Sequence, residues 1–377
     1  MTLENSRVAS KRLLGIDIFR GIAAYGVVLI HGLGEIPRTE NSLFISNSFV
    51  VLCVPFFLIT SFYFTRKSIS LNDTKNYLNN RSQRILIPYF LWTLIYLLAR
   101  FIGSLIGNQE SFNRLISDPI NIIFFGAAGV QLYFLPLLFC GNLIVIPVIK
   151  MFQKIQSILL VLICFFFSIY LFYLMVTTGN DFALGEGIAF KQIIDISSFA
   201  NTWLFHLIRF ILVVLAWIIK CMPYIIFIII IQDYPVQRLL SNCIDIGHKR
   251  EYKWIVLFLV PLGIFAILNL NLYFLNLFVP YISFLYAIFI SEIISRHSLI
   301  SLIAKKMGYF SFGIYLIHAL ITAGFLPIVI KLYPQIMTYQ LSTPMLIISS
   351  GVIFFISLTI TYLISLNKTA ARILLAI

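Results

Sequence analysis

Residues 14–31 read LGIDIFRGIAAYGVVLIH, an apolar run long enough to cross a bilayer as a helix. The run nevertheless carries three polar side chains, Asp17, Arg20 and His31. A charge near the centre of a membrane-spanning helix costs about 2.5 to 3.5 kcal/mol on insertion scales, so such groups face protein or water rather than lipid. The stretch therefore predicts a transmembrane helix that carries a functional face.

The three polar residues are predicted to follow one side of this helix. At 3.6 residues per turn, the step from Arg20 to His31 leaves both side chains within about 20° of one face and roughly 16 Å apart along the axis. Asp17 lies one turn before Arg20 on the same side. The pattern predicts a stripe from a charged pair near one membrane surface to an imidazole near the other. The alternative is a buried ion pair and a hydrogen-bonded histidine that only fix helix packing.

The composition is that of an all-α, polytopic membrane protein. Of the 377 residues, 60% are hydrophobic and only 11% are charged. A soluble domain of this size could not bury so much apolar surface. The net charge of +13 comes from basic residues scattered between apolar segments, which favours orientation in a membrane over binding of nucleic acid. The five cysteines lack CxxC or other metal-ligand spacing, so no metal site is expected.

About ten membrane-spanning segments are predicted from the apolar runs. They cover residues 14–31, 44–64, 88–106, 129–149, 158–176, 203–231, 254–270, 274–294, 309–330 and 344–366. A short helix at the membrane surface is expected over 73–84, with Pro88 in the first turn of the span that follows. The long run 203–231 is expected to be one tilted or kinked helix, with Pro223 as the kink point.

The basic residues support this count and give it an orientation. If the N-terminus lies in the cytoplasm, most of the 27 Lys and Arg fall in inner segments, and every even-numbered span ends in a basic cluster. Both termini are therefore expected in the cytoplasm, as tails over 1–13 and 367–377 around a helical bundle over 14–366. Residues 1–377 are expected to form one transmembrane domain, with multiple passes through the cell membrane, either plasma or inner.

Arg81 and Arg84 form a second candidate site. Two arginines three residues apart share one helix face, and two planar guanidinium groups suit bidentate binding of phosphate. They emerge on the same side of the membrane as the Asp17 and Arg20 end of the first span, so an anionic cytoplasmic donor is expected there. Plain topology signals or contacts with anionic lipid headgroups are the alternative.

Two later spans carry further candidate residues. His206 and Arg209 lie near the outer end of the sixth span, where His206 is expected to approach His31 around one cavity. Tyr315 and His318 lie one turn apart in the ninth span. For both pairs, packing, lipid anchoring or hydrogen bonds to a neighbouring helix are alternatives to a substrate contact.

Four stretches in chain order resemble the membrane-bound acyltransferase 3 family. They are residues 15–24 followed by His31, Val54-Pro55-Phe56-Phe57 through Ser61, the RxxR element Arg81-Ser82-Gln83-Arg84 leading to Pro88, and residues 313–318. Two positions depart from the family pattern. Phe62 stands where the family usually has Gly, and Tyr133-Phe134-Leu135 stands where it usually has Trp-Phe-Leu.

The resemblance implies transfer of an acyl group, commonly acetyl, from cytoplasmic acyl-CoA to a hydroxyl of an extracytoplasmic or lipid-linked glycan. It implies that Arg20 and His31 are the functional pair, with His31 as the base that takes the hydroxyl proton. Arg20, oriented by Asp17, is expected to stabilise the developing anion or the phosphates of the donor.

Arg81 and Arg84 are expected to hold the nucleotide end of acyl-CoA, with acetyl-CoA as the expected co-substrate. Further candidates for substrate contacts are Ser61, His206, Arg209, Tyr315 and His318.

Two other functions use the same features. A transporter or flippase of a lipid-linked sugar or small anion would also place Arg and His near mid-bilayer, although no inverted repeat is visible. A membrane scaffold or sensor without turnover would tolerate apolar residues at Arg20 and His31. The expected partners are a glycan or lipid-linked saccharide acceptor and membrane lipids, and an oligomer is possible.

Overall fold

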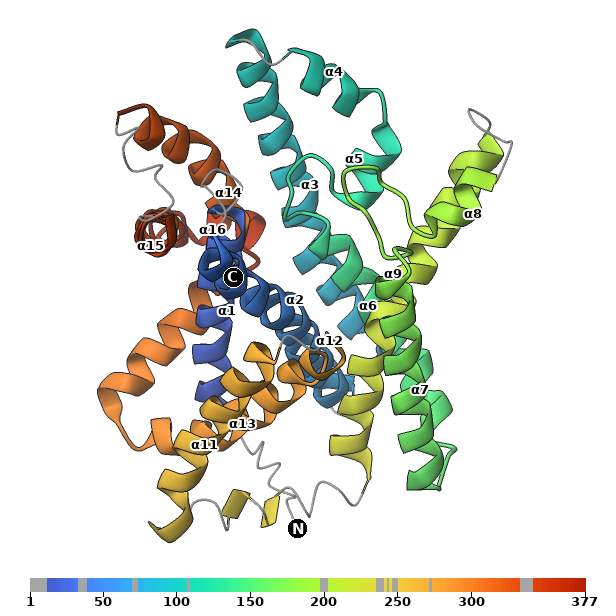
Figure 1. The fold of residues 1–377 in the computed structure, drawn as a ribbon, viewed down its shortest axis with the longest axis vertical. Coiled ribbons are helices and arrows are strands. Elements are labelled where there is room, and N and C mark those ends of the chain that lie inside the picture. The colour runs from blue at the N-terminus through green and yellow to red at the C-terminus, as the bar shows by residue number, and fades with distance from the viewer. Residues whose placement is uncertain are drawn as a thin grey trace, which may run out of the picture.

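The computed structural model describes residues 12–32, 39–69, 74–106, 109–196, 203–234, 241–242, 244–245, 250–270, 273–332 and 342–377 (Figure 1). The described residues form helices joined by turns and loops, and contain one isolated antiparallel β-bridge, between Ala183 and Ile188. The protein is therefore all-α, as its composition predicts.

The longer helices form the bundle. They are α1 (Leu14–Gly32), α2 (Glu40–Ile69), α3 (Thr74–Ile106), α6 (Phe134–Phe152), α7 (Ile158–Thr177), α9 (Trp203–Asp233), α11 (Arg250–Asn269), α13 (Val279–Ser295), α14 (Ser298–Leu332) and α15 (Ser342–Ser365). Short helices lie between them or follow them. They are α4 (Gln109–Ile116), α5 (Pro119–Phe125), α8 (Lys191–Ile196), α12 (Tyr273–Asn276) and α16 (Lys368–Leu374).

The described residues contain nine helices that are long and apolar enough to cross a membrane, and the apolar part of α11, Lys253–Asn269, is shorter. Nine of the ten predicted spans thus correspond to candidate spans among the described residues, and the remaining one, predicted over 254–270, corresponds to the shorter apolar helix in α11. Arg12 before α1 and Ile377 after α16 line one and the same cavity.

Two predicted boundaries are wrong, because helices extend farther than the apolar runs. A separate surface helix over 73–84 is absent from the described part of the chain, where α3 runs unbroken from Thr74 through Pro88. Contacts with α2 hold this extension in line, since Tyr77 and Arg81 hydrogen-bond to Thr65 and Ser61. Likewise, α14 begins at Ser298, eleven residues before the predicted start of the ninth span at residue 309.

Helix α9 agrees with its prediction, whereas α6 begins later than predicted. Residues 203–231 form one helix, α9, with Pro223 inside it, as predicted. The fourth span begins at Phe134 rather than at residue 129. Residues Gly126 to Tyr133 instead form turns, which start at Gly126 with a left-handed backbone (φ +81°) that favours glycine.

Helix α1 lies at the centre of one half of the bundle and packs against α14, α2, α13 and α15 (Figure 1). Glycines make the closest of these approaches possible. A side chain at Gly308 of α14 would collide with the carboxylate of Asp17, and one at Gly15 would collide with the carbonyl of Ala287 on α13. The close packing explains how a helix with charged residues can be buried.

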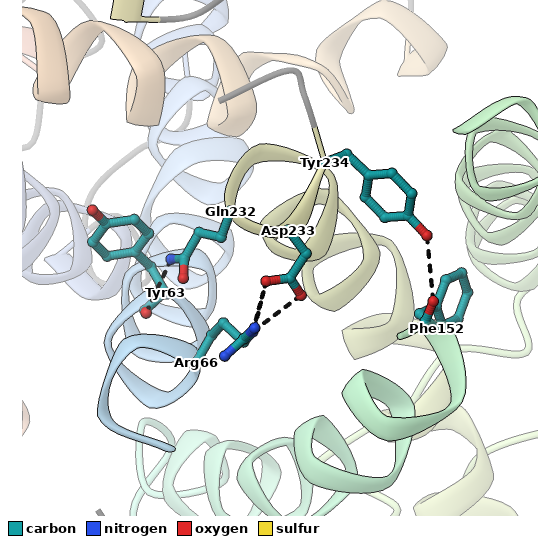
Figure 2. A network of polar contacts seen from close by, with 6 residues as sticks. All are labelled: Tyr63, Arg66, Phe152, Gln232, Asp233 and Tyr234. Carbon is teal, nitrogen blue, oxygen red and sulfur yellow. Dashed lines mark hydrogen bonds and ion pairs between the residues drawn. The ribbon is translucent and has the colours of Figure 1, made fainter. Parts of the chain in front are cut away.

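The other half of the bundle is built on α9, which packs against α7, α6 and α2 (Figure 1). Figure 2 shows the polar contacts between one end of α9 and its neighbours. Arg66 at the end of α2 forms a two-pronged ion pair with Asp233, its Nη2 lying 2.5 Å from Oδ1. Gln232 donates to the carbonyl of Tyr63, and Tyr234 donates to the carbonyl of Phe152 on α6. These contacts hold three helix ends together.

Candidate active site

A cavity of about 340 Å³ gathers four of the chain's arginines, and we call it the arginine cavity. Its polar lining is Arg12, Arg20, Thr60, Ser61, Arg81, Arg84, Tyr309 and Tyr315. The residues come from the segment before α1 and from α1, α2, α3 and α14. In the sequence these arginines lie in separate segments, and the packing of the helices brings them into the lining of one cavity.

Arg81 is held in this cavity by a buried polar network. Its Nη2 donates a hydrogen bond of 2.6 Å to Ser61 Oγ. Ser61 in turn lies 3.4 Å from the side-chain nitrogen of Asn142 on α6, and Thr65 donates to Asn142 Oδ1 at 2.7 Å. The Nε of Arg81 is buried and makes no hydrogen bond within the described structure. A fixed guanidinium with an unused donor suits a phosphate oxygen.

Asp17 makes a different ion pair from the one that the sequence predicts. Its carboxylate lies 2.5 Å from Nε of Arg12 rather than within ion-pair distance of Arg20. Ile16 and Asp17 donate to the carbonyl of Leu13, as in the first turn of a helix. Arg12 lies just before this turn, and its side chain reaches Asp17 five residues later. An ion pair with Arg12 thus takes the place of the predicted pair between Asp17 and Arg20, and Arg20 lines the arginine cavity.

A second cavity, of about 400 Å³, contains His31 and is called here the histidine cavity. Its polar lining is His31, Gln131, Tyr133, Asp181, Lys220, Tyr224, Asn276 and Tyr315. The remaining lining is apolar and comes largely from α1, α2 and α7. The volume lies in the range of about 300 to 1,000 Å³ that is typical of small-molecule sites.

His31 is paired with His318 of α14. The centroids of the two rings lie 5.2 Å apart, with the planes tilted by 31°. Nδ1 of His318 lies 2.7 Å from the carbonyl oxygen of Tyr315, and because a carbonyl can only accept, this nitrogen carries the proton. Nε2 of His318 is buried and has no partner in the described structure. It is therefore an unused acceptor next to the His31 ring.

Tyr315 lines both cavities. Its hydroxyl donates to the backbone carbonyl of Gln131, and its ring packs against Phe134 with centroids 5.6 Å apart and against Phe57 at 6.4 Å. Phe57 and Phe134 also line the arginine cavity. The single polar stripe predicted for α1 therefore serves two cavities that share Tyr315, with Arg20 in one and His31 in the other.

His206 and Arg209 are not among the residues that line either cavity. Arg209 is only 4% exposed, and it binds Asp118 at 2.7 Å and the carbonyl of Gly187 at 2.7 Å. It thus ties together two loops, instead of facing a substrate cavity. The predicted approach of His206 to His31 is also wrong, since α14 supplies the partner histidine and His206 lies beside Phe205.

Several residues of the two cavities are not predicted from the sequence. Arg12 lines the arginine cavity, although its position before the first span marks it only as one of the basic residues that orient the chain. Asn142 and Lys220 are polar residues inside apolar runs, and a polar residue in such a run indicates a position that faces protein or a cavity. Gln131 and Asp181 lie in turns, where polar residues are common, and no local pattern distinguishes them. Among the described residues, no three His, Cys, Asp or Glu side chains cluster as metal ligands would.

Comparison with known protein families decides the kind of chemistry. A family model described as an acyltransferase domain matches residues 13–366, nearly the whole chain. The chain belongs to the acyltransferase 3 family. No curated protein and no solved structure shows a significant match. This acyltransferase is therefore a multi-pass membrane protein, as its resemblance to the family predicts.

Proposed function

We propose that this acyltransferase moves an acyl group, in the simplest case acetyl, from cytoplasmic acyl-CoA to a hydroxyl of an extracytoplasmic or lipid-linked glycan. The observation that carries the proposal is the arrangement of a cavity with four arginines and a cavity with His31, which share Tyr315. The donor carries phosphates and the acceptor carries hydroxyls, so the two substrates need different binding sites that meet where the acyl group is transferred.

The arginine cavity is the proposed donor site. The nucleotide end of acyl-CoA carries several phosphates, and guanidinium groups bind phosphate in a bidentate manner. Arg81 and Arg84 lie on one face of α3 and both line the cavity, and the Nε of Arg81 has no hydrogen-bond partner in the described structure. The excess of Lys and Arg in the predicted inner segments supports a cytoplasmic position for this cavity.

Arg20 is assigned to the donor rather than to the reacting carbonyl. Arg20 and His31 lie eleven residues apart on α1, which is about 16 Å along a helix axis. Arg20 and His31 therefore cannot both contact the phosphates of the donor. The extended pantetheine arm of acyl-CoA would cover this interval, with the thioester close to Tyr315 and the nucleotide among the arginines.

His31 is the proposed general base. It would take the proton of the acceptor hydroxyl as the hydroxyl oxygen attacks the thioester carbon. The new C–O bond forms, the C–S bond breaks, and the proton passes from His31 to the leaving thiolate of CoA. The oxygen ester remains on the glycan. Because donor and acceptor meet inside the bundle, CoA does not have to cross the membrane.

Two measurements test this function. Thermal unfolding of the protein in lipid nanodiscs should shift upward with acetyl-CoA and not with a sugar phosphate; the reverse result would favour the transporter or flippase. Mass spectrometry of surface glycans from cells with and without the gene should show the added acyl group and its carrier. Unchanged acylation in cells with normal membrane levels of His31→Ala would contradict the catalytic assignment.

A further inference from the structure

The histidine cavity contains a balanced pair of charges. Among the described residues that line it, Asp181 and Lys220 are the two with full charges, and Lys220 Nζ lies 3.6 Å from Asp181 Oδ2. Their side chains are 29% and 18% exposed, so the pair is partly shielded from solvent. The cavity thus has almost no net charge, in contrast to the four arginines of the arginine cavity.

The same cavity offers unused hydrogen-bond acceptors. Gln131 is 1% exposed, and its Oε1 accepts no hydrogen bond within the described structure, whereas its Nε2 donates to the carbonyl of Leu316. Oδ1 of Asn276 is also buried and without a partner there. A buried carbonyl oxygen that lacks a donor destabilises the protein, so both atoms favour a ligand that brings O–H groups.

These features together exclude two classes of ligand. A phosphate or carboxylate would face two amide oxygens and a carboxylate, while the ammonium of Lys220 is already balanced by Asp181. An alkyl chain would offer no donor to the two amide oxygens and would place apolar groups around the ion pair. A compact, uncharged molecule with many hydroxyls satisfies the acceptors and keeps the charges balanced.

We infer that the histidine cavity binds an uncharged saccharide unit, whose hydroxyls donate to Gln131, Asn276 and Asp181. This inference rests on the proposed function, in which the same cavity receives the acceptor. It goes further by assigning the acceptor contacts to residues outside α1 and by making the balance between Asp181 and Lys220 the basis of selection against anionic sugars. The hydroxyl nearest His31 is then the one that reacts.

The test is saccharide-dependent thermal unfolding of the full chain in nanodiscs. The probes are methyl glycosides of neutral sugars (glucose, galactose, rhamnose and N-acetylglucosamine) and the glucuronide and galacturonide of matching size. In the wild type, at least one neutral glycoside should raise the melting temperature more than either uronide. In Asp181→Asn, which removes the carboxylate beside Lys220, the half-saturating concentration of a uronide should fall by at least about tenfold relative to that of the neutral glycoside.

Glu186→Gln is the matched control. Glu186 forms an exposed ion pair with Lys191 in the same loop region, at 3.1 Å, and does not line the cavity. General stabilisation by sugars excluded from the protein surface affects both variants equally, so the difference between Asp181→Asn and Glu186→Gln is the quantity that counts. Acetyl-CoA should shift both variants as it shifts the wild type.

Three results would overturn the inference: no neutral glycoside shifts the wild type beyond the general effect, a uronide shifts it as much, or Asp181→Asn keeps the wild-type order. The first two need no variant, so they remain decisive even if Asp181→Asn fails to fold. A protein that responds to neutral glycosides but not to acetyl-CoA would instead refute the donor half of the proposed function and leave the saccharide site standing.

Discussion

His31 on α1 and His318 on α14 face one another, with ring centroids 5.2 Å apart. His31 lines the histidine cavity, whereas His318 is fully buried behind it. The hydrogen bond from His318 Nδ1 to the carbonyl of Tyr315 fixes the tautomer that leaves Nε2 open. The pair thus consists of one ring that a substrate can reach and one that can only act through its neighbour.

Substitutions of the two histidines should therefore differ in size of effect. His31→Ala should lower kcat for acyl transfer by about 10² to 10⁴, the range of general-base contributions. His318→Asn should lower it by only about tenfold, because His318 packs against the His31 ring and does not line the cavity that receives the acceptor. The exposed His297 gives the control His297→Asn, expected at the wild-type rate. Equal losses in His31→Ala and His318→Asn would contradict this division of roles.

Arg81→Lys should weaken donor binding while preserving the positive charge. A lysine cannot form the planar fork that reaches Ser61 and a phosphate together, so KM for acetyl-CoA should rise by about tenfold, equivalent to about 1.4 kcal/mol, with kcat little changed. Arg114→Lys makes the same chemical change at an exposed position on α4 and should leave KM unaltered. An unchanged KM in Arg81→Lys would argue against the arginine cavity as donor site.

Gly308→Ala should destabilise the contact between α1 and α14. The added methyl group would collide with the carboxylate of Asp17, and overpacking of this kind costs about 1 to 3 kcal/mol. Gly324→Ala lies on the same helix in open space and should be neutral or stabilising by up to about 1 kcal/mol. Unfolding in mixed detergent micelles measures both. If the two variants were equally stable, α1 and α14 would not be in the close contact described.

The contact of Arg66 with Asp233 in Figure 2 should contribute measurably to stability. Both side chains are only 15% exposed, and a double-mutant cycle with Arg66→Gln and Asp233→Asn should give a coupling of about 1 to 2 kcal/mol. The pair of Arg296 and Glu292 is 58% and 40% exposed and should couple by no more than about 0.5 kcal/mol. Similar couplings for the two pairs would show that burial adds nothing to the contact at the end of α9.

Local sequence patterns predicted the elements well and their ends less well. Apolar runs and proline positions located the spans, because the bilayer sets their length and each run reports on its own segment. They missed the first turns of α3 and α14, where polar residues continue the helix. There the deciding interactions are with other helices, such as the hydrogen bond between Tyr77 and Thr65.

The site divides in the same way. The sequence by itself determined that α1 is a membrane helix with Arg20 and His31 on one face, and that Arg81 and Arg84 share a face of α3, since helix periodicity fixes both. Only the tertiary structure decided that Asp17 pairs with Arg12, that His318 rather than His206 joins His31, and that Gln131, Asp181 and Lys220 surround one cavity. Helix periodicity relates residues within one helix. The partner of His31 and the lining of its cavity come from helices and turns far apart in sequence, and the partner of Asp17 comes from the segment before α1, so packing decides all three.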